Sequence, residues 1–162
     1  MTGIRVQVYD QVRMRYRLGV GVRALALLLV AATGLAQANE AVWSRLRSIE
    51  AAFRQGDATA LRLSFSTAGK VRVELKDVPG GQRWYAPSQL QVIFAQIFEQ
   101  YSTRELAFPK TDVTLSSPGT AFARGRWLRR ARHGGPDSTD TLTFTLCEEG
   151  GDWRILEIRS SR

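Results

Sequence analysis

The chain has 162 residues, with 23 Lys or Arg, 15 Asp or Glu and a formal net charge of +8. It contains one Cys and one His, which excludes an intramolecular disulfide and a zinc site built from several Cys or His ligands. Residues 1–38 hold five Arg and one Asp, which leaves 18 basic and 14 acidic side chains, a net charge of +4, from residue 39 onward. The sequence pI of about 10.5 therefore overstates how basic the remaining chain is.

The N-terminal residues predict a secretory signal peptide. Four arginines between Arg13 and Arg23 precede an apolar run from Ala24 to Ala32, and the small residues Ala36 and Ala38 follow it. This order is typical of a signal that is cleaved after an Ala-x-Ala site. The run is far shorter than the roughly 20 apolar residues that cross a bilayer.

We therefore predict that residues 1–38 form a cleaved signal peptide and that the product is soluble and exported, periplasmic or secreted. The sequence leaves open whether translation starts at Met1 or Met14, because a start at Met14 gives a signal of ordinary length. Export argues against nucleic acid as a partner. Residues 39–162 are expected to form a single domain, since 124 residues suffice for one core.

Helices are predicted at the start of this domain. From Glu40 to Gln55, apolar residues recur with helical spacing at Val42, Leu46, Ile49 and Phe53. Gly56 is expected to end this helix, and Asp57 to cap a second helix from Ala58 to Phe65.

A strand from Val71 to Leu75 and a Pro79-Gly80-Gly81 turn come next and lead to Trp84 and Tyr85. A long helix is predicted from Pro87 to Ser102. Its apolar face is formed by Leu90, Ile93, Phe94, Ile97, Phe98 and Tyr101. So broad an apolar face requires a sheet to cover it.

Four strands are predicted in the rest of the chain, at residues 112–117, 120–132, 139–148 and 153–160, with Pro-Gly and Gly-Gly turns between them. Cys147 is expected to be a half-buried strand residue. The predicted fold class is α+β, with helices, a short hairpin, a long helix and then a meander.

This order resembles the nuclear transport factor 2-like (cystatin-like cone) superfamily. The resemblance also rests on Ala-Phe-Arg-Gln-Gly-Asp57 at the end of the first helix, Tyr85 before the long helix, and Gly-Asp-Trp-Arg-Ile155 at the last strand. It implies a curved antiparallel sheet of about five to six strands around a long helix, with an N-terminal helical pair and a cone-shaped interior. Within the superfamily, the chain is most similar to exported bacterial domains of unknown function.

Enzymes of this superfamily place Asp, His or Tyr inside the cone, next to a substrate carbonyl. Here His133 lies in a Gly-Gly-Pro loop that should be exposed, and no Tyr is present on the first helix. We therefore predict no catalytic residue, no metal and no cofactor. The cone-lining candidates for a ligand are Tyr85, Phe98, Tyr101 and Trp127.

One strand concentrates positive charge. Alternation places Arg124, Arg126 and Arg130 on one face, and Trp127 and Arg129 on the other. The three arginines on the first face are candidates for anion binding, for example to an anionic polymer of the envelope. The alternative is a solvated sheet face or edge that resists aggregation.

Together these patterns predict a non-enzymatic binding or protein-interaction module of the bacterial cell envelope. Its expected partner is a small apolar ligand or an envelope protein, with a homodimer through the sheet as a further option. The alternative is an isomerase- or cyclase-like enzyme that uses Tyr85, Tyr101 or Asp112 in the cone. A buried carboxylate beside a phenol would favour that alternative.

Overall fold

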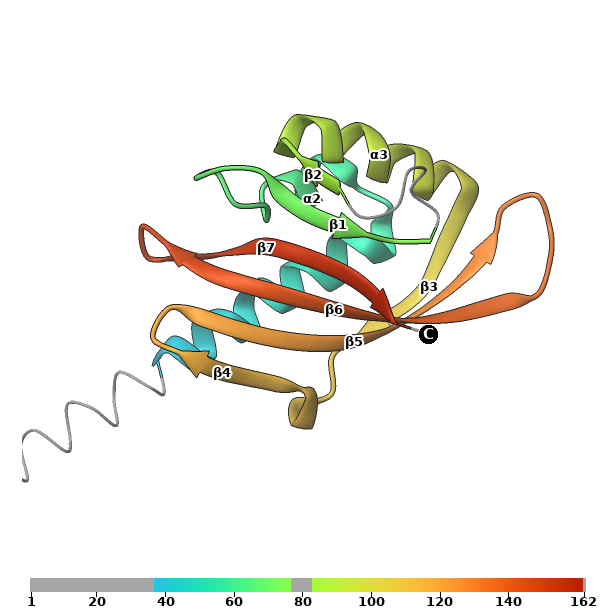
Figure 1. Cartoon of the computed structure of the whole chain (residues 1–162). Helices are drawn as coiled ribbons and strands as arrows, with labels where there is room; N and C mark the ends of the chain where they lie inside the picture. The colour runs from blue at the N-terminus through green and yellow to red at the C-terminus, as the bar shows by residue number, and fades with distance from the viewer. Residues whose placement is uncertain (1–36, 77–82, 162) are drawn as a thin grey trace, which may run out of the picture. The chain divides into compact units, whose positions relative to one another are not determined.

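A mixed seven-stranded sheet lies against helices in the computed structural model, which describes residues 37–76 and 83–161 (Figure 1). The predicted signal residues 1–36 and the Pro79-Gly80-Gly81 turn lie outside the described residues. The chain divides into two units, residues 1–40 and 41–162, and the fold below is that of the second unit. None of the described helices is long and apolar enough to span a membrane.

The elements follow the predicted order with two additions. After a helix that ends at residue 55 come α2 (Ala58–Arg62), β1 (Val71–Glu74), β2 (Arg83–Tyr85), α3 (Pro87–Gln100), β3 (Tyr101–Ala107), the 3₁₀ helix η1 (Lys110–Asp112), β4 (Val113–Ser117), β5 (Thr120–Ala131), β6 (Asp137–Glu149) and β7 (Asp152–Ser161). The α+β class is confirmed. The additions are β3 and η1, which the sequence did not predict.

The strands are arranged in the order β2-β1-β7-β6-β5-β3, and β4 pairs with the first residues of β5. Strands β4 to β7 form the predicted antiparallel meander. In contrast, β1 pairs with β7 in parallel, with Val73 opposite Ile158. The sheet is therefore mixed, because a strand from the first half of the chain joins the last one.

The helical corner at Gly56 forms as predicted. Gly56 has a positive φ of 67°, which glycine adopts without steric cost. The amides of Gly56 and Asp57 donate to the carbonyls of Phe53 and Ala52 at 3.2 and 2.9 Å, a pattern that satisfies the last carbonyls of the helix. Asp57 then caps α2 by accepting from the Ala60 amide at 2.9 Å. Helix α2 ends at Arg62, before its predicted end at Phe65. Phe65 forms an isolated β-bridge with Ile155 instead.

The long helix α3 ends at Gln100 rather than at Ser102, because Tyr101 already has extended backbone and begins β3. Tyr101 is therefore a strand residue and not part of the apolar face of the helix. Asp112 was predicted to begin a strand, but it lies in η1.

The core fills the space between the helices and the sheet face that they cover, here called the inner face. At its centre is an aromatic cluster made of Phe53, Phe94, Phe98, Trp127 and Phe144. The other four rings lie 5.4–6.3 Å from the ring of Phe53, mostly edge to face, which is a favourable geometry for aromatic pairs. All five side chains are buried, so the apolar stripe of the first helix is confirmed as core.

Gly125 on β5 makes room for another ring. A Cβ atom at this position would lie 2.7 Å from Cε1 of Phe108, which is too close for any side chain. The absence of a side chain lets Phe108 pack on the strand and reach Phe144, with 5.3 Å between ring centres.

Candidate functional site

Strand β5 carries charged side chains on both faces of the sheet. Its residues alternate between buried and more exposed positions along most of its length, as the sequence predicts. Arg129 and Trp127 lie on the inner face, whereas Arg124, Arg126 and Arg130 lie on the opposite, outer face. Each face holds a candidate site.

The inner face holds a charge cluster, defined here as Lys76, Tyr101, Trp127, Arg129 and Asp140. Nη2 of Arg129 lies 2.7 Å from Oδ2 of Asp140, and Nζ of Lys76 donates to Oδ1 of the same carboxylate at 2.8 Å. The guanidinium carbon of Arg129 lies 4.2 Å from the ring centre of Tyr101 and 4.3 Å from that of Trp127. Both oxygens of Asp140 therefore contact a cation.

This cluster compensates the burial of an arginine side chain. Arg129 is 1% exposed. Burying an isolated charge costs roughly several kcal/mol, even after the protein around it has relaxed. A carboxylate at ion-pair distance and two aromatic faces within about 6 Å offset that cost. Asp140 reaches the site because it lies directly opposite Trp127 in the β5–β6 register.

The sequence reasoning missed Asp140, although a signal for it exists. Asp140 has the same parity as Leu142, Phe144 and Leu146, which are the buried residues of β6. A carboxylate in phase with the apolar face of a strand predicts a buried ion pair. Arg129, in phase with Trp127 on the neighbouring strand, is the matching cation.

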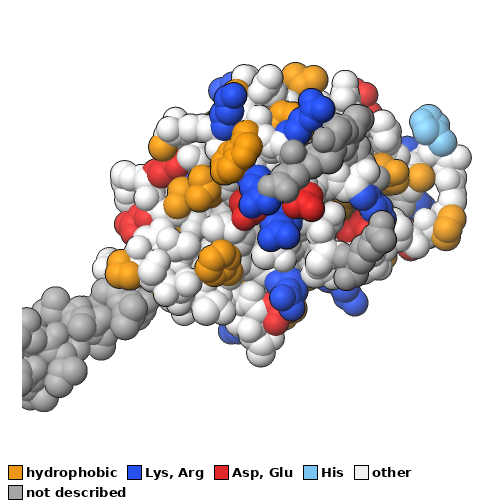
Figure 2. Space-filling view, viewed as in Figure 1, with side chains coloured by type: hydrophobic (Ala, Val, Ile, Leu, Met, Phe, Trp, Pro, Cys, Tyr) orange, Lys and Arg blue, Asp and Glu red, His pale blue; other side chains and the backbone are white. Residues whose placement is uncertain are grey.

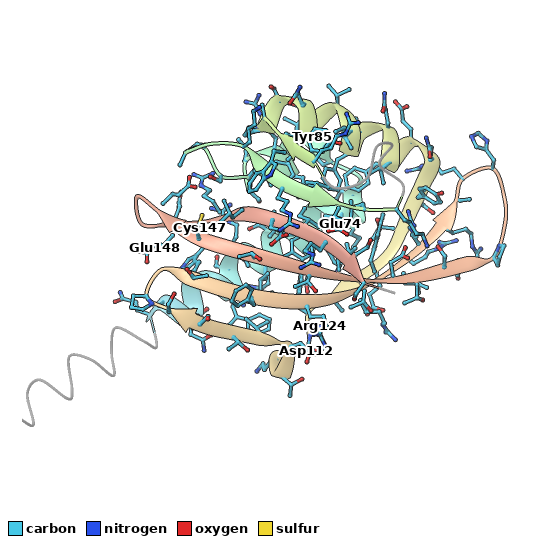
Figure 3. All side chains as sticks on the ribbon, in the orientation of Figure 1. Glu74, Tyr85, Asp112, Arg124, Cys147 and Glu148 are labelled. Atoms are coloured by element: carbon cyan, nitrogen blue, oxygen red, sulfur yellow. The ribbon has the colours of Figure 1, made fainter. Side chains whose placement is uncertain are left out.

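The four cone-lining candidates lie in different surroundings. Phe98 and Trp127 are buried in the aromatic cluster, and the indole Nε1 of Trp127 donates to Oγ1 of Thr103 at 3.0 Å. Tyr101 is half-buried against Arg129. Tyr85 ends β2, opposite Val71, and Figure 3 shows it close to α3, away from Arg124. The fold thus brings Phe98, Trp127 and Tyr101 close together, but Tyr85 lies on the far edge strand.

Two residues of types that commonly act in acid–base chemistry are His133 and Glu50. The first is exposed in a loop, and the second already accepts a hydrogen bond. His133 is exposed in the loop after β5, as predicted. Glu50 on the first helix accepts from the amide of Phe108 at 3.2 Å. Within the described residues, no group of three His, Cys, Asp or Glu side chains could hold a metal ion.

The outer face carries several ion pairs. Arg126 lies 3.2 Å from Glu105 and Arg130 lies 2.6 Å from Asp137. The hydrogen bond between Arg130 and Asp137 raises the pKa of the guanidinium and lowers that of the carboxyl group. Figure 2 shows basic and acidic side chains interspersed on the molecular face that it presents. Two of the three predicted anion-binding arginines therefore already have carboxylate partners.

Arg124 differs from these neighbours. It lines a hollow of about 270 Å³ together with Thr111, Asp112, Thr114, Phe122, Ala123 and Thr143. Within the described residues, Arg124 has no carboxylate at ion-pair distance, and Asp112 has no cation. Figure 3 shows Arg124 and Asp112 near each other beside β5 and η1.

A further polar group anchors the loop after α2. Glu149 accepts hydrogen bonds from the hydroxyl of Ser66 and from the amide of Thr67, the latter at 2.9 Å. Cys147 is half-buried, as predicted, and its thiol lies 3.4 Å from Glu149. Burial, and then the hydrogen bond to Glu149, raise the pKa of this thiol to about 11. Such a thiol is largely protonated at neutral pH and a poor nucleophile.

Solved structures share the fold of this chain. A nuclear transport factor 2-like protein of unknown function from Shewanella oneidensis has a TM-score of 0.59 and 18% identity over 76% of this chain and 98% of that one. A ketosteroid isomerase-like protein from Erwinia carotovora atroseptica has a TM-score of 0.58 and 17% identity, covering 75% and 93%. An uncharacterized protein with a cystatin-like fold from Caulobacter vibrioides has a TM-score of 0.58 and 17% identity, covering 76% and 87%.

The chain matches no protein-family model and no curated protein. At these identities the structural likeness establishes the fold alone. The chain therefore has the nuclear transport factor 2-like fold, as the sequence motifs predict. The fold itself does not decide between binding and catalysis, because one scaffold supports both.

Proposed function

We propose that this protein is a non-enzymatic binding or protein-interaction module of the bacterial cell envelope, and that it binds through the outer face of its sheet. The observation that carries the proposal is the filled interior. The aromatic cluster occupies the space between the helices and the sheet, and Phe53, Phe94 and Phe144 have no exposed surface. A small apolar ligand inside would have to displace packed rings, which costs packing energy.

The envelope location rests on the predicted signal peptide. We expect the mature protein to begin at Asn39 when the chain is expressed in a bacterial host. Cell fractionation followed by intact-mass measurement tests this. A protein that remains in the cytoplasm with residues 25–30 still attached would contradict the envelope assignment.

One hypothesis for the outer face is that Arg124, Arg126 and Arg130 bind a polyanion. The effect of salt on binding tests this hypothesis most directly. If the three arginines bind a polyanion, binding of the purified protein to anionic lipid or glycan weakens with added salt, because such contacts are Coulombic, and disappears when all three become Glu. The carboxylates beside Arg126 and Arg130 favour a solvated face. We therefore expect little binding to a generic polyanion.

One observation favours an isomerase- or cyclase-like enzyme as a second candidate. The carboxylate of Asp140 and the ring of Tyr101 both contact Arg129, which brings a largely buried carboxylate near a phenol. A solved structure with this fold is described as ketosteroid isomerase-like. A general base, however, needs a lone pair directed at the substrate, and both oxygens of Asp140 contact cations.

Assays of the wild-type protein distinguish the two candidates. We expect no isomerisation of a β,γ-unsaturated ketone and no dehydration of a β-hydroxy ketone above the rate in buffer. Turnover that Asp140→Asn or Tyr101→Phe abolishes and Asp137→Asn retains would establish the enzymatic candidate. Tyr101→Phe keeps the ring against Arg129 and removes only the hydroxyl, so it separates chemistry from folding.

A further inference from the structure

Two oppositely charged side chains of the outer face, Arg124 and Asp112, line one hollow. Four outer-face arginines have carboxylate partners: Arg72 with Glu157 at 3.1 Å, Arg126 with Glu105 at 3.2 Å, Arg130 with Asp137 at 2.6 Å and Arg159 with Glu74 at 3.5 Å. Among the described residues, Arg124 and Asp112 carry opposite charges without such partners, although they line the same hollow.

The strands define the position of these groups. Arg124 lies on β5 opposite Thr143 of β6, and Phe122, two residues earlier, lies opposite Thr114 of β4. Asp112 comes from η1, immediately before β4. The sheet therefore forms the floor of the hollow and η1 contributes to its rim. Among the described residues, the carboxylate of Asp112 accepts one hydrogen bond, a long one of 3.4 Å from the neighbouring Thr111 hydroxyl.

The lining indicates what kind of ligand would fit. A guanidinium binds a carboxylate through two parallel N–H donors, and a carboxylate binds an ammonium group. The hydroxyls of Thr111, Thr114 and Thr143 add hydrogen-bonding groups. Phe122 is 42% exposed, so its ring offers an apolar surface beside these polar groups. The volume is below the roughly 300–1,000 Å³ of pockets that hold drug-sized ligands.

We propose that this hollow binds a free α-amino acid with an aromatic or long apolar side chain. The α-carboxylate binds Arg124, the α-ammonium group binds Asp112, and the side chain packs on Phe122. This inference rests on the proposed function, because it names the ligand class of a binding surface on the outer face. It explains why two opposite charges remain unpaired where every neighbouring arginine named above has a partner.

A titration with phenylalanine and two blocked derivatives tests the proposal. With the full-length protein, isothermal titration calorimetry should show saturable binding of L-phenylalanine in the millimolar range or below. N-acetylphenylalanine lacks the ammonium group and phenylalanine amide lacks the carboxylate, so each should bind at least about tenfold more weakly, since each loses a charge-assisted hydrogen bond. Equal binding of the N-acetyl derivative would mean that Arg124 is an anion site only and would overturn the proposal.

Variants of the protein complete the test. Arg124→Gln and Asp112→Asn should each weaken phenylalanine binding at least about tenfold, whereas the matched control Arg126→Gln, on the same face of β5, should leave it unchanged. All three side chains are exposed, so thermal melts should match that of the wild type. No saturation by phenylalanine, or equal weakening in Arg126→Gln, would overturn the inference. The proposed function would then still be decided by the fractionation and turnover experiments, which do not depend on amino acid binding.

Discussion

Arg129 and Arg130 are neighbours on β5, yet they have opposite environments. Arg129 is 1% exposed and is held by Asp140 and two aromatic rings. Arg130 is exposed and pairs with Asp137 in solvent. The difference shows that the side of the sheet, and not the residue type, decides what each arginine contributes. A buried cation must be compensated by its surroundings, whereas an exposed ion pair contributes little to stability.

The largest difference between the faces should come from their aromatic residues. Phe94→Ala removes a buried ring of the aromatic cluster and should lower the free energy of unfolding by about 3–5 kcal/mol. Phe122→Ala, on the outer face, should lower it by less than about 1 kcal/mol. Urea denaturation of both variants measures this. Equal losses would show that Phe122 is also packed in a core, one that lies on the outer face of the sheet.

The arginine pair provides the next test. Arg129→Met keeps a long apolar side chain but leaves Lys76 as the remaining cation beside Asp140. It should lower the free energy of unfolding by about 2–4 kcal/mol, because removing one partner leaves a buried charge without compensation. Arg130→Met should cost at most about 1 kcal/mol, since its ion pair is exposed. The same denaturation measurement checks both. A loss in Arg129→Met no larger than that in Arg130→Met would mean that the inner charge cluster contributes nothing to stability.

A smaller effect is expected at Gly125. Gly125→Ala places a methyl group against the ring of Phe108 and should cost about 1–3 kcal/mol, as overpacking typically does. Gly69→Ala is the control, because no atom lies within 4 Å of its added Cβ and a change within about 0.5 kcal/mol is typical of the surface. If the two thermal midpoints move equally, the contact with Phe108 does not explain the effect of Gly125→Ala.

The smallest effect should depend on pH. Burial acts to raise the pKa of Glu149, but the hydrogen bonds from Ser66, Thr67 and Cys147 together hold it below the usual 4.5. A carboxyl with a lowered folded-state pKa stabilises the protein above its unfolded pKa, and this contribution is lost as pH falls through the folded value. The difference in thermal midpoint between wild type and Glu149→Gln should therefore be present at neutral pH and narrow below pH 4.5. A difference that does not change with pH would contradict this assignment.

Periodicity predicted most of the fold because most elements have one strongly apolar face. The stripe from Val42 to Phe53 and the alternation from Leu142 to Leu146 each correspond to fully buried residues. Strand β3 was missed because its residues are mainly polar and its register shifts between Thr103 and Glu105, which breaks any simple alternation. It exists because β5 offers an edge for pairing, a tertiary cause that local pattern does not contain.

The candidate sites were predicted less completely than the fold. Alternation along β5 placed Arg124, Arg126 and Arg130 on one face, but it could not show which of them finds a carboxylate. Those partners come from β3 and β6, and register decides which side chains meet. The parallel pairing of β1 with β7 was unpredictable for the same reason, since no local signal specifies a partner strand far along the chain.

That parallel pairing has a consequence for the order of folding. The hydroxyl of Ser160 on β7 donates to the carbonyl of Glu74 on β1 across 86 positions of sequence, and β7 lies between β1 and β6. Contacts so distant in sequence form slowly, because a long loop must close first. The sheet cannot join its two sides before residues 152–161 are available. A chain crossing a membrane in the unfolded state would therefore complete its sheet only after these residues had emerged.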